Sequence, residues 1–290
     1  MNRYFLCIAA AAVLLTAACN KQQSEKEDPP EKSETGIITM TTQSSEVYFY
    51  LQFTSGTDNL IIDWGDGEGN KTYATTSSYS DYCYLNVFHS YSGGSEHHIT
   101  ITGDNIEHLY CMGDIMTGGN LLTALDVSRY TALKELYCGG NPLTSLDVSR
   151  NTTLTHLNCA GNLLSTLDVS RNTALKELSC HYNQLTTLDV SRNTALTSLS
   201  CEYNPLTTLD VSNNTTIKFV YCHYNQLTAS ALNDLFRTLP EVPVSQTKQG
   251  PYPDSPFTIY IYENPGTSDC DISIAQEKGW RVYPPGRGDD

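Results

Sequence analysis

The fold is decided by residues 143–163, which read LTSLDVSRNTTLTHLNCAGNL. The same pattern returns at a fixed interval of 21 residues through the centre of the chain. The leucines that open successive repeats are Leu122, Leu143, Leu164, Leu185, Leu206 and Leu227. A fixed period in this range is typical of a solenoid, in which every repeat forms one coil and contacts its neighbours. The centre of the chain is therefore predicted to be a stack of similar coils.

The spacing of apolar residues inside one repeat predicts where the core lies. Leu157 and Cys159 are two residues apart and share one face of a strand, while Leu154 precedes that strand and fills the same interior. The return pass from Leu143 to Val148 has the same spacing and is expected to form the opposite wall. Such coils stack through a parallel ladder with strands about 4.8 Å apart. The predicted fold class is therefore mainly β, with parallel strands in 21-residue coils.

Polar residues that recur in the repeat are expected to be structural. Asp147 and Ser149, like their counterparts in other repeats, can close turns through bonds from side chain to backbone. An asparagine follows each cysteine by three residues and is expected to point inward and bond the turn backbone. These asparagines are Asn141, Asn162, Asn183, Asn204 and Asn225. A catalytic nucleophile and its base must instead converge at one unique site, so we expect no enzymatic activity.

A cysteine recurs in the strand of each repeat, and three interpretations compete. A disulfide needs Cβ atoms about 3.8 Å apart, whereas equivalent side chains on parallel strands point the same way. A metal needs ligands arranged around it, which a single row does not supply. We therefore favour buried thiols that act as small hydrophobic groups, and expect no cofactor. The row consists of Cys111, Cys138, Cys159, Cys180, Cys201 and Cys222, and pairing between Cys83 and Cys270, outside it, stays open.

The repeat motif, LTxLDVSxN joined to LxxLxCxxN, resembles the 21-residue leucine-rich repeats of bacterial internalins. The cysteine row is most similar to the internalin-J-like branch of that family, and the resemblance covers residues 105–264. Internalins are surface adhesins, so the resemblance implies a leucine-rich repeat solenoid that serves extracellular recognition. On that basis we expect a protein partner, on a host or bacterial surface, that binds the concave face of the repeats.

The first residues read as an export signal. Arg3 precedes an apolar run that is too short for a mature membrane span. The run ends in Leu15-Thr16-Ala17-Ala18-Cys19, which resembles the lipobox of bacterial lipoproteins. Residues 1–18 are therefore predicted to be a lipoprotein signal peptide, with Cys19 as the lipid-modified first residue. Residues 19–35 hold no large apolar side chain and carry an acidic stretch, which predicts a flexible tether at the surface of the outer membrane.

Charge and ligand spacing exclude further partner classes. The chain has 32 acidic and 17 basic residues, a formal net charge of -15. Nucleic acids and anionic membrane surfaces are themselves negative, so neither is expected to attract the folded part. His181 and His223 lie two strands apart, about 9.6 Å, which is too far for them to share a zinc ion.

Residues 36–104 contain no repeat and alternate apolar with polar residues, as in Val47-Tyr48-Phe49-Tyr50-Leu51. Short alternating strands predict a small N-terminal β-sandwich. Asp63-Trp64-Gly65-Asp66-Gly67 and His89-Ser90-Tyr91 resemble elements of polycystic-kidney-disease (PKD) Ig-like domains. The acidic side chains of the first stretch offer calcium ligands, but their spacing is not that of an EF-hand, and a glycine-rich turn is favoured.

The C-terminal part is expected to close the solenoid. Residues 232–239 carry leucine and phenylalanine at helical spacing, and the pattern stops at Pro240. A final repeat-like strand is expected at 257–264, and residues 265–290 are predicted to be a helical cap. The segment ends in Arg287-Gly288-Asp289, a tripeptide read by some animal integrins that carries little weight alone.

Residues that flank the inward leucine and cysteine of each strand face outward. Many are aromatic, and exposed tyrosines suit both protein interfaces and sugar stacking. The predicted partner-binding residues are Tyr137, Phe219, Tyr221, His223, Tyr224, Tyr260 and Tyr262. The series Tyr182, Tyr203 and Tyr224 is equally compatible with packing of the three rings against one another. A protein partner is the leading hypothesis, and a glycan captured for nutrient uptake is the alternative.

Overall fold

The structure is a computed structural model that describes residues 36–54, 60–73, 82–93, 95–113, 120–243 and 257–283. These residues belong to one compact unit. The predicted signal peptide, Cys19, the tether and the Arg287–Asp289 motif lie outside the described residues, as does the side chain of Cys83. Among the described helices, none is both long enough and apolar enough to cross a membrane.

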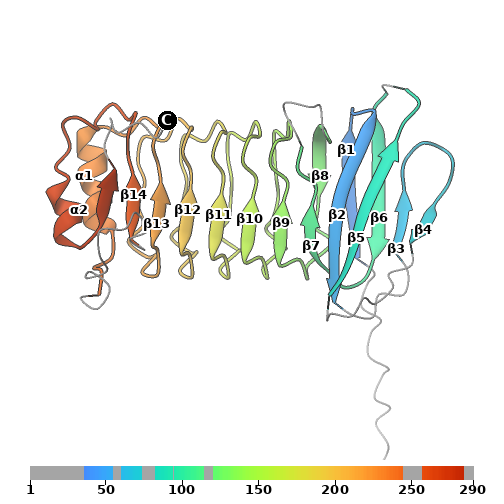
Figure 1. Cartoon of the computed structure of the whole chain (residues 1–290), viewed down its shortest axis with the longest axis horizontal. Helices are drawn as coiled ribbons and strands as arrows, with labels where there is room; N and C mark the ends of the chain where they lie inside the picture. The colour runs from blue at the N-terminus through green and yellow to red at the C-terminus, as the bar shows by residue number, and fades with distance from the viewer. Residues whose placement is uncertain are drawn as a thin grey trace, which may run out of the picture. The chain divides into compact units, whose positions relative to one another are not determined.

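A long sheet of ten described strands runs along the coils (Figure 1). Its order is β15-β14-β13-β12-β11-β10-β9-β7-β2-β5, and neighbours from β7 to β15 pair in parallel. These parallel strands are β7 (Ile106–Tyr110), β9 (Glu135–Tyr137), β10 (His156–Asn158), β11 (Glu177–Ser179), β12 (Ser198–Ser200), β13 (Phe219–Tyr221), β14 (Thr258–Tyr260) and β15 (Arg281–Tyr283). The register sets the central leucines Leu136, Leu157 and Leu178 side by side.

The strand β15 extends the ladder beyond the strand expected at 257–264, which is therefore not the final one. It pairs in parallel with β14 and places Tyr283 beside Tyr260. Its three residues are Arg281-Val282-Tyr283. As in Thr258-Ile259-Tyr260, an apolar residue stands in the middle and a tyrosine comes last. The long sheet thus continues into the segment predicted to be a helical cap.

The N-terminal strands join the solenoid directly. β2 (Glu46–Thr54) pairs antiparallel with β5 (Tyr82–Ser90) on one side and with β7 on the other. A second sheet has the order β4-β3-β6-β1-β8. Its strands are β4 (Lys71–Tyr73), β3 (Leu60–Asp63), β6 (His97–Gly103), β1 (Gly36–Thr42) and β8 (Leu122–Asp126). Because β8 opens the first repeat, both sheets reach from the N-terminal strands into the first coil and cover the edge of the repeat stack.

The residues of the PKD-like stretches meet in one cluster between these two sheets. The Trp64 ring lies 5.7 Å from that of Phe49 and stacks on His89 at 4.3 Å. The Tyr91 hydroxyl donates to the carbonyl oxygen of Trp64 at 2.9 Å. Nε2 of His89 lies 3.0 Å from the Asp66 carboxylate, which also accepts a backbone N–H of its own turn. Asp66 is therefore engaged in the turn and in an ion-pair contact.

The return passes form the second wall of the core without forming strands. Leu143 and Val148 are fully buried, as their spacing predicted, yet the described return passes after β8 have no strand. Side chains form hydrogen bonds with the backbone N–H and carbonyl groups that would otherwise bond a neighbouring strand. Nδ2 of Asn172 donates to the carbonyl oxygen of Val148 at 2.9 Å, and the Asp147 carboxylate accepts the N–H of Ser149 at 2.9 Å. Side chains therefore replace sheet bonds along this wall.

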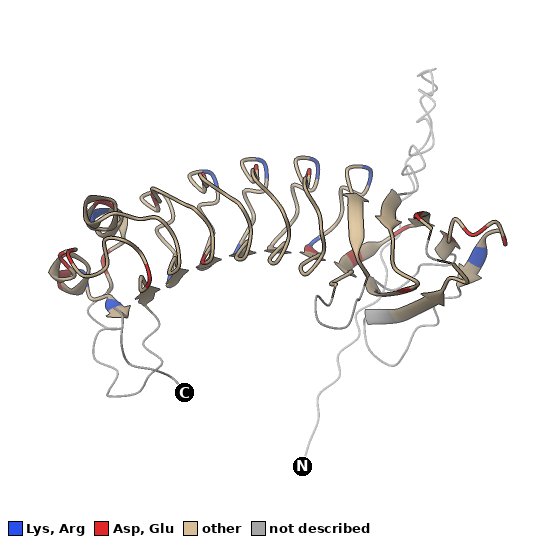
Figure 2. Ribbon diagram, turned by 90° about the horizontal axis from the view of Figure 1, so that it is seen from above, with Lys and Arg blue, Asp and Glu red and all other residues tan. Residues whose placement is uncertain are grey.

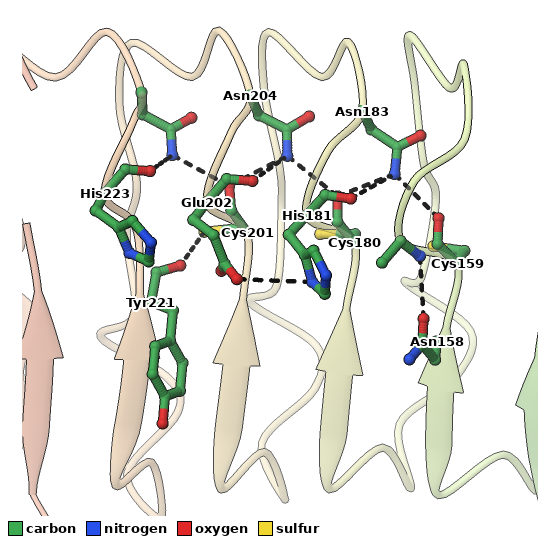
Figure 3. A network of polar contacts seen from close by, with 12 residues as sticks. Asn158, Cys159, Cys180, His181, Asn183, Cys201, Glu202, Asn204, Tyr221 and His223 are labelled. Atoms are coloured by element: carbon green, nitrogen blue, oxygen red, sulfur yellow. Dashed lines mark hydrogen bonds and ion pairs between the residues drawn. The ribbon is translucent and has the colours of Figure 1, made fainter. Parts of the chain in front are cut away.

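The asparagine three residues after each cysteine points inward, as predicted (Figure 3). Nδ2 of Asn183 donates to the carbonyl oxygens of Cys159 and Cys180, each at 3.0 Å. Its Oδ1 accepts the N–H of Leu164 at 3.0 Å. One amide thus satisfies buried backbone groups of two neighbouring coils, and equivalent bonds recur from coil to coil.

The cysteine row is buried along the inner face of the long sheet. All six cysteines of the row carry free thiols and are inaccessible to solvent. Burial raises the pKa of Cys111 and of Cys159 to about 12, and raises the pKa of the other four as well. Cys270 lies outside the row, is partly exposed and also has a raised pKa because of burial. The row is therefore protonated at neutral pH and acts as apolar packing.

Two helices lie at the C-terminal end of the coils (Figure 1). α1 (Ala229–Thr238) buries apolar residues on one face, at the spacing predicted for residues 232–239. α2 (Ser273–Glu277) is a single short turn of helix. The indole N–H of Trp280 donates to the carbonyl oxygen of Pro240 at 2.8 Å, which ties the segment after α2 to the end of α1.

Candidate binding face

Outward side chains of the long sheet form rows because equivalent residues are in register. The first row takes in the position before each cysteine of the row and the residues paired with it on β2, β14 and β15, and it has tyrosine at both ends and small polar residues in the middle. Its members, in order across the sheet, are Tyr50, Tyr110, Tyr137, Asn158, Ser179, Ser200, Tyr221, Tyr260 and Tyr283. We call this series the tyrosine row.

The N-terminal end of the tyrosine row is a cluster of three rings. Tyr110 stacks on Tyr137 with centroids 4.4 Å apart and planes at 6°, and meets Tyr50 edge to face at 5.0 Å. The Tyr110 hydroxyl donates to Oε2 of Glu135 at 2.9 Å. Burial, and then this hydrogen bond, raise the pKa of Tyr110 above its usual range. The cluster is therefore a rigid platform whose polar edge is already bonded.

The C-terminal end of the row is a second cluster. Tyr221, Tyr260 and Tyr283 stack in series, with centroids 4.8 and 4.7 Å apart and planes within 10°. Beside them, His223 and Tyr262, which follow β13 and β14, stack on each other with ring centroids 4.1 Å apart. Aromatic rings held in this way present a large contact area at a small entropy cost.

Between the two clusters the row consists of smaller side chains. Asn158, Ser179 and Ser200 occupy the three strands that separate Tyr137 from Tyr221. Four strand spacings of about 4.8 Å make this interval about 19 Å wide. We call it the serine recess. Its two ends are formed by the outermost tyrosine rings of the clusters.

The second row, two residues earlier on each strand, is charged at its N-terminal end. Nδ1 of His108 and Nδ1 of His156 lie 3.4 and 3.5 Å from the Glu135 carboxylate between them. Nε2 of His156 also lies 3.8 Å from Glu177. Burial lowers the pKa of His108, despite the neighbouring glutamates. The row therefore presents carboxylates beside histidines, of which His108 loses its charge readily because it is buried.

The third row, directly after the cysteines, changes from small to large along the sheet. The first coils carry Gly139 and Ala160, and the next carry His181, Glu202 and His223. Figure 3 shows the Glu202 carboxylate turned toward the His181 ring, where Oε1 lies 3.7 Å from Nδ1. Burial raises the pKa of Glu202 to about 7, and burial lowers that of His223 to about 4. Oε2 of Glu202 is buried without a hydrogen-bond partner among the described residues.

A stack of tyrosines stands at the turn that follows this row. Tyr182 and Tyr203 are 4.0 Å apart and Tyr203 and Tyr224 are 4.2 Å apart, with planes within 14°. All three have left-handed backbones, with φ between 50 and 54°, where earlier coils have Gly140 and Gly161. The rings do pack against one another, yet Tyr182 and Tyr224 are still 53% and 39% exposed. The stack lines an open hollow of about 500 Å³ on the surface.

Within the described segments, no three His, Cys, Asp or Glu side chains are grouped so that they could hold a metal ion. His181 and His223 are separated by the strand that carries Glu202. The face therefore offers aromatic, hydroxyl and carboxylate groups for non-covalent recognition.

The predicted partner-binding residues fall into two places. Phe219, Tyr221, His223, Tyr224, Tyr260 and Tyr262 all lie on or just after β13 and β14. Tyr137 lies apart from them, on the far side of the serine recess. The sequence analysis missed Tyr50 and Tyr283, which extend the two clusters, and missed the buried setting of Glu202. Tyr283 could have been predicted from the tripeptide that it ends, which resembles Thr258-Ile259-Tyr260. Tyr50 could not, because it joins the row through the antiparallel pairing of β2 with β7, which lies outside the repeats.

No family model and no curated protein matches the sequence. Solved structures do match it. The functional domain of InlJ from Listeria monocytogenes, which includes a cysteine ladder, is 31% identical, with 61% of this chain and 49% of that one covered and a TM-score of 0.38. Internalin C2 from the same organism is 17% identical, with 62% and 81% covered and a TM-score of 0.43. A Shigella effector leucine-rich repeat domain is 23% identical, with 57% and 77% covered and a TM-score of 0.38.

These neighbours are leucine-rich repeat proteins, and two are internalins, as the repeat motif predicted. The chain spans about half the length of the InlJ domain that it matches. What the whole of that domain binds is therefore not carried over to this chain.

Proposed function

We propose that the chain is a non-enzymatic binding protein that recognises a protein partner through the outer face of the long sheet. The observation that carries the proposal is the tyrosine row, with its two stacked clusters on one surface. Large, preorganised aromatic side chains are the residues that most often dominate the energy of protein interfaces. Because the backbone ladder holds them in register, they lose little freedom when a partner binds.

The partner-facing residues divide into anchors and surroundings. Tyr221 and Tyr260 are proposed as the anchors, because they stack at 4.8 Å and lie among other predicted residues. Phe219, His223 and Tyr262 surround them, while Tyr137 anchors the other end of the recess. A partner that spans both clusters must therefore bridge about 19 Å.

A pull-down from an extract of surface proteins, followed by measured affinity for each captured protein, tests this proposal. The expected result is saturable binding that weakens at least tenfold in Tyr221→Ala and Tyr260→Ala variants, as for hot-spot residues. A matched control is Leu163→Ala, which removes an exposed apolar side chain outside the row and outside the predicted partner-binding residues. Saturable binding that survives both anchor substitutions would contradict the proposal.

A glycan is the second candidate, favoured by the exposed stack of Tyr182, Tyr203 and Tyr224. The stack lines a hollow of about 500 Å³, and flat exposed rings suit sugar faces. A glycan array probed with the purified protein distinguishes the two candidates. Sugar binding that is lost in Tyr203→Ala, but retained in Tyr221→Ala, would favour a glycan at the stack over a protein at the row.

We further propose that the protein is a lipoprotein of the outer membrane, exposed at the cell surface and anchored through Cys19. The support is the lipobox-like stretch before Cys19 and the polar tether at residues 19–35. The N-terminal strands at 36–104 are proposed to be a PKD-like module, and residues 265–290 the closing cap of the solenoid at 105–264. In this arrangement the tether leaves the outer face of the long sheet accessible to other cells.

A further inference from the structure

We propose that the serine recess binds a cationic side chain, an arginine or lysine of the protein partner, and that the Glu202 carboxylate receives it. This inference rests on the proposed function and names the chemistry of the partner at one place on the face. It is carried by the small polar side chains of the recess, by the Glu202 carboxylate at its edge, whose Oε2 accepts no hydrogen bond within the described segments, and by the charge of the surrounding rows.

The recess provides a polar floor and an aromatic wall. Ser179 and Ser200 are the smallest side chains of the tyrosine row, and Ser200 lies directly opposite Tyr221 in the ladder. Tyr221 stacks on Tyr260 through one ring face, so its other face is turned toward Ser200. A guanidinium or ammonium group above Ser200 would lie against that ring face, which attracts cations through its quadrupole.

Glu202 stands at the edge of the same recess. It follows Ser200 by two residues, so both side chains emerge on the same face. Its carboxylate has one ion-pair contact, at 3.7 Å to His181, and its Oε2 is buried with no hydrogen-bond partner in the described segments. A charged carboxylate that is largely buried is costly, and the Glu202 side chain is still 14% exposed, so a cation at the surface can approach it and lower that cost by Coulomb attraction.

The surrounding charge favours a cation over other ligands. The outward positions of β9 to β13 include Glu135 and Glu177 and hold no lysine or arginine, while the exposed lysines Lys134, Lys176 and Lys218 directly precede β9, β11 and β13. The basic residues of the solenoid include a series at the return turns, on the side of the coils opposite the strands (Figure 2). The net charge of the chain is -15. A basic segment is therefore attracted to this face and oriented by it.

The titratable groups that face Glu202 make the site sensitive to pH. They are His181 from the end of β11 and His223 from the end of β13, while Tyr221 on β13 senses the Glu202 charge with its hydroxyl turned away (Figure 3). The pKa of Glu202 is raised by burial to about 7, whereas burial lowers the pKa of both histidines. Between pH 6 and pH 8 the carboxylate gains its charge and the histidines lose any that remains. Both changes favour a bound cation, so affinity is expected to rise about tenfold over this interval.

The test uses N-acetyl-arginine amide as the probe, titrated into the purified full chain at pH 8 and at pH 6. The neutral analogue N-acetyl-citrulline amide is titrated in parallel. We expect saturable binding of the arginine probe at pH 8, about tenfold weaker binding at pH 6, and no saturable binding of the citrulline probe. Equal binding of the two probes, or arginine binding that does not change with pH, overturns the inference without any variant.

Variants then locate the site. Glu202→Gln is expected to abolish binding of the arginine probe, while Glu277→Gln, which removes the same charge from the exposed helix α2, leaves it intact. Equal loss in both variants would show that only net charge matters and would overturn the inference. Capture of a protein partner that depends on Tyr221 but not on Glu202 would also overturn it, while the proposed function stands. If the arginine probe binds at Glu202 but no protein binds at the tyrosine row, the proposed function is contradicted and the cation site stands.

Discussion

Tyr182 and Tyr203 stack with ring centroids 4.0 Å apart, although each has a left-handed backbone that favours glycine. For a residue with a side chain this conformation costs roughly 1 kcal/mol. In the two preceding coils the equivalent positions are Gly140 and Gly161. The later coils therefore have a strained turn that carries an exposed tyrosine. These are the same coils in which the third row has large side chains in place of glycine and alanine.

Replacing the central ring of this stack separates backbone strain from ring packing. We expect Tyr203→Gly to be more stable than Tyr203→Ala by about 1 kcal/mol, because glycine adopts the left-handed backbone without strain. Chemical unfolding of the two variants measures the difference. Leu163 is exposed and has an ordinary backbone, so there the order is expected to reverse, with Leu163→Ala the more stable. The same order at both positions would contradict the explanation.

Removing one inward asparagine should weaken two coils at once. Asn183→Ala leaves the carbonyl oxygens of Cys159 and Cys180 and the N–H of Leu164 without their side-chain partner. We expect a loss of about 3 kcal/mol in the free energy of unfolding, measured by urea denaturation. Asn213→Ala, at an exposed position, is the control and is expected to change stability by less than about 0.5 kcal/mol. A similar effect at the two sites would argue against the bonding role.

The buried thiols should resist alkylation in the native protein. Cys270 is partly exposed, whereas Cys159 is fully buried with its pKa raised to about 12. We expect iodoacetamide at pH 8 to modify Cys270 first and Cys159 only after denaturant is added, because the thiolate is the reactive form. Peptide mapping by mass spectrometry reports the order. Equal rates at the two residues in the native protein would contradict a closed core.

The buried carboxylate should make stability depend on pH. Burial raises the pKa of Glu202 from 4.5 to about 7, so the folded state holds a proton that the unfolded state has released. Its contribution to stability is therefore present below pH 4.5 and is lost as pH rises through about 7. Relative to the wild type, Glu202→Gln is expected to become progressively more stable between pH 5 and pH 8, roughly the window between these two pKa values.

Measuring both proteins at every pH removes the contribution of other groups. His223 acts in the opposite sense, because its lowered pKa of about 4 makes stability fall as the pH drops below 6.5. That effect is common to the wild type and the variant. A difference between the two proteins that stays constant from pH 5 to pH 8 would show that Glu202 titrates normally.

The N-terminal proposal has a separate test. If Cys19 carries lipid, growth with radiolabelled palmitate should label the wild-type chain and leave Cys19→Ala unlabelled. Labelling of the Cys19→Ala protein would remove the proposed anchor without affecting the fold of residues 36–283.

The repeat period predicted most of the solenoid because its information is local. A spacing of two between Leu157 and Cys159 defines one inward face, and three more residues lead to Asn162, which the structure places inward as well. The same periodicity identified Tyr221 and Tyr260 as outward neighbours. Their stacking follows from the register of the ladder, which equal repeat lengths largely determine.

The parts that escaped prediction depend on contacts between distant segments. Tyr50 reaches Tyr110 because β2 pairs antiparallel with β7, and no repeat links the two strands. The return wall was expected to stack as a ladder, but side-chain amides such as that of Asn172 take the carbonyl groups instead. The buried setting of Glu202 depends on which way its side chain turns, and spacing alone says nothing about rotamers.

The asparagine bonds between coils have a consequence for how such a chain can evolve. Asn162 and Asn183 make equivalent contacts with the preceding coil and with their own coil, so the junctions between coils are chemically alike. A duplicated or deleted unit of 21 residues would meet familiar partners on both sides. Recombination within the gene can therefore lengthen or shorten the recognition surface in whole steps, while substitutions at the outward positions rewrite what each step reads.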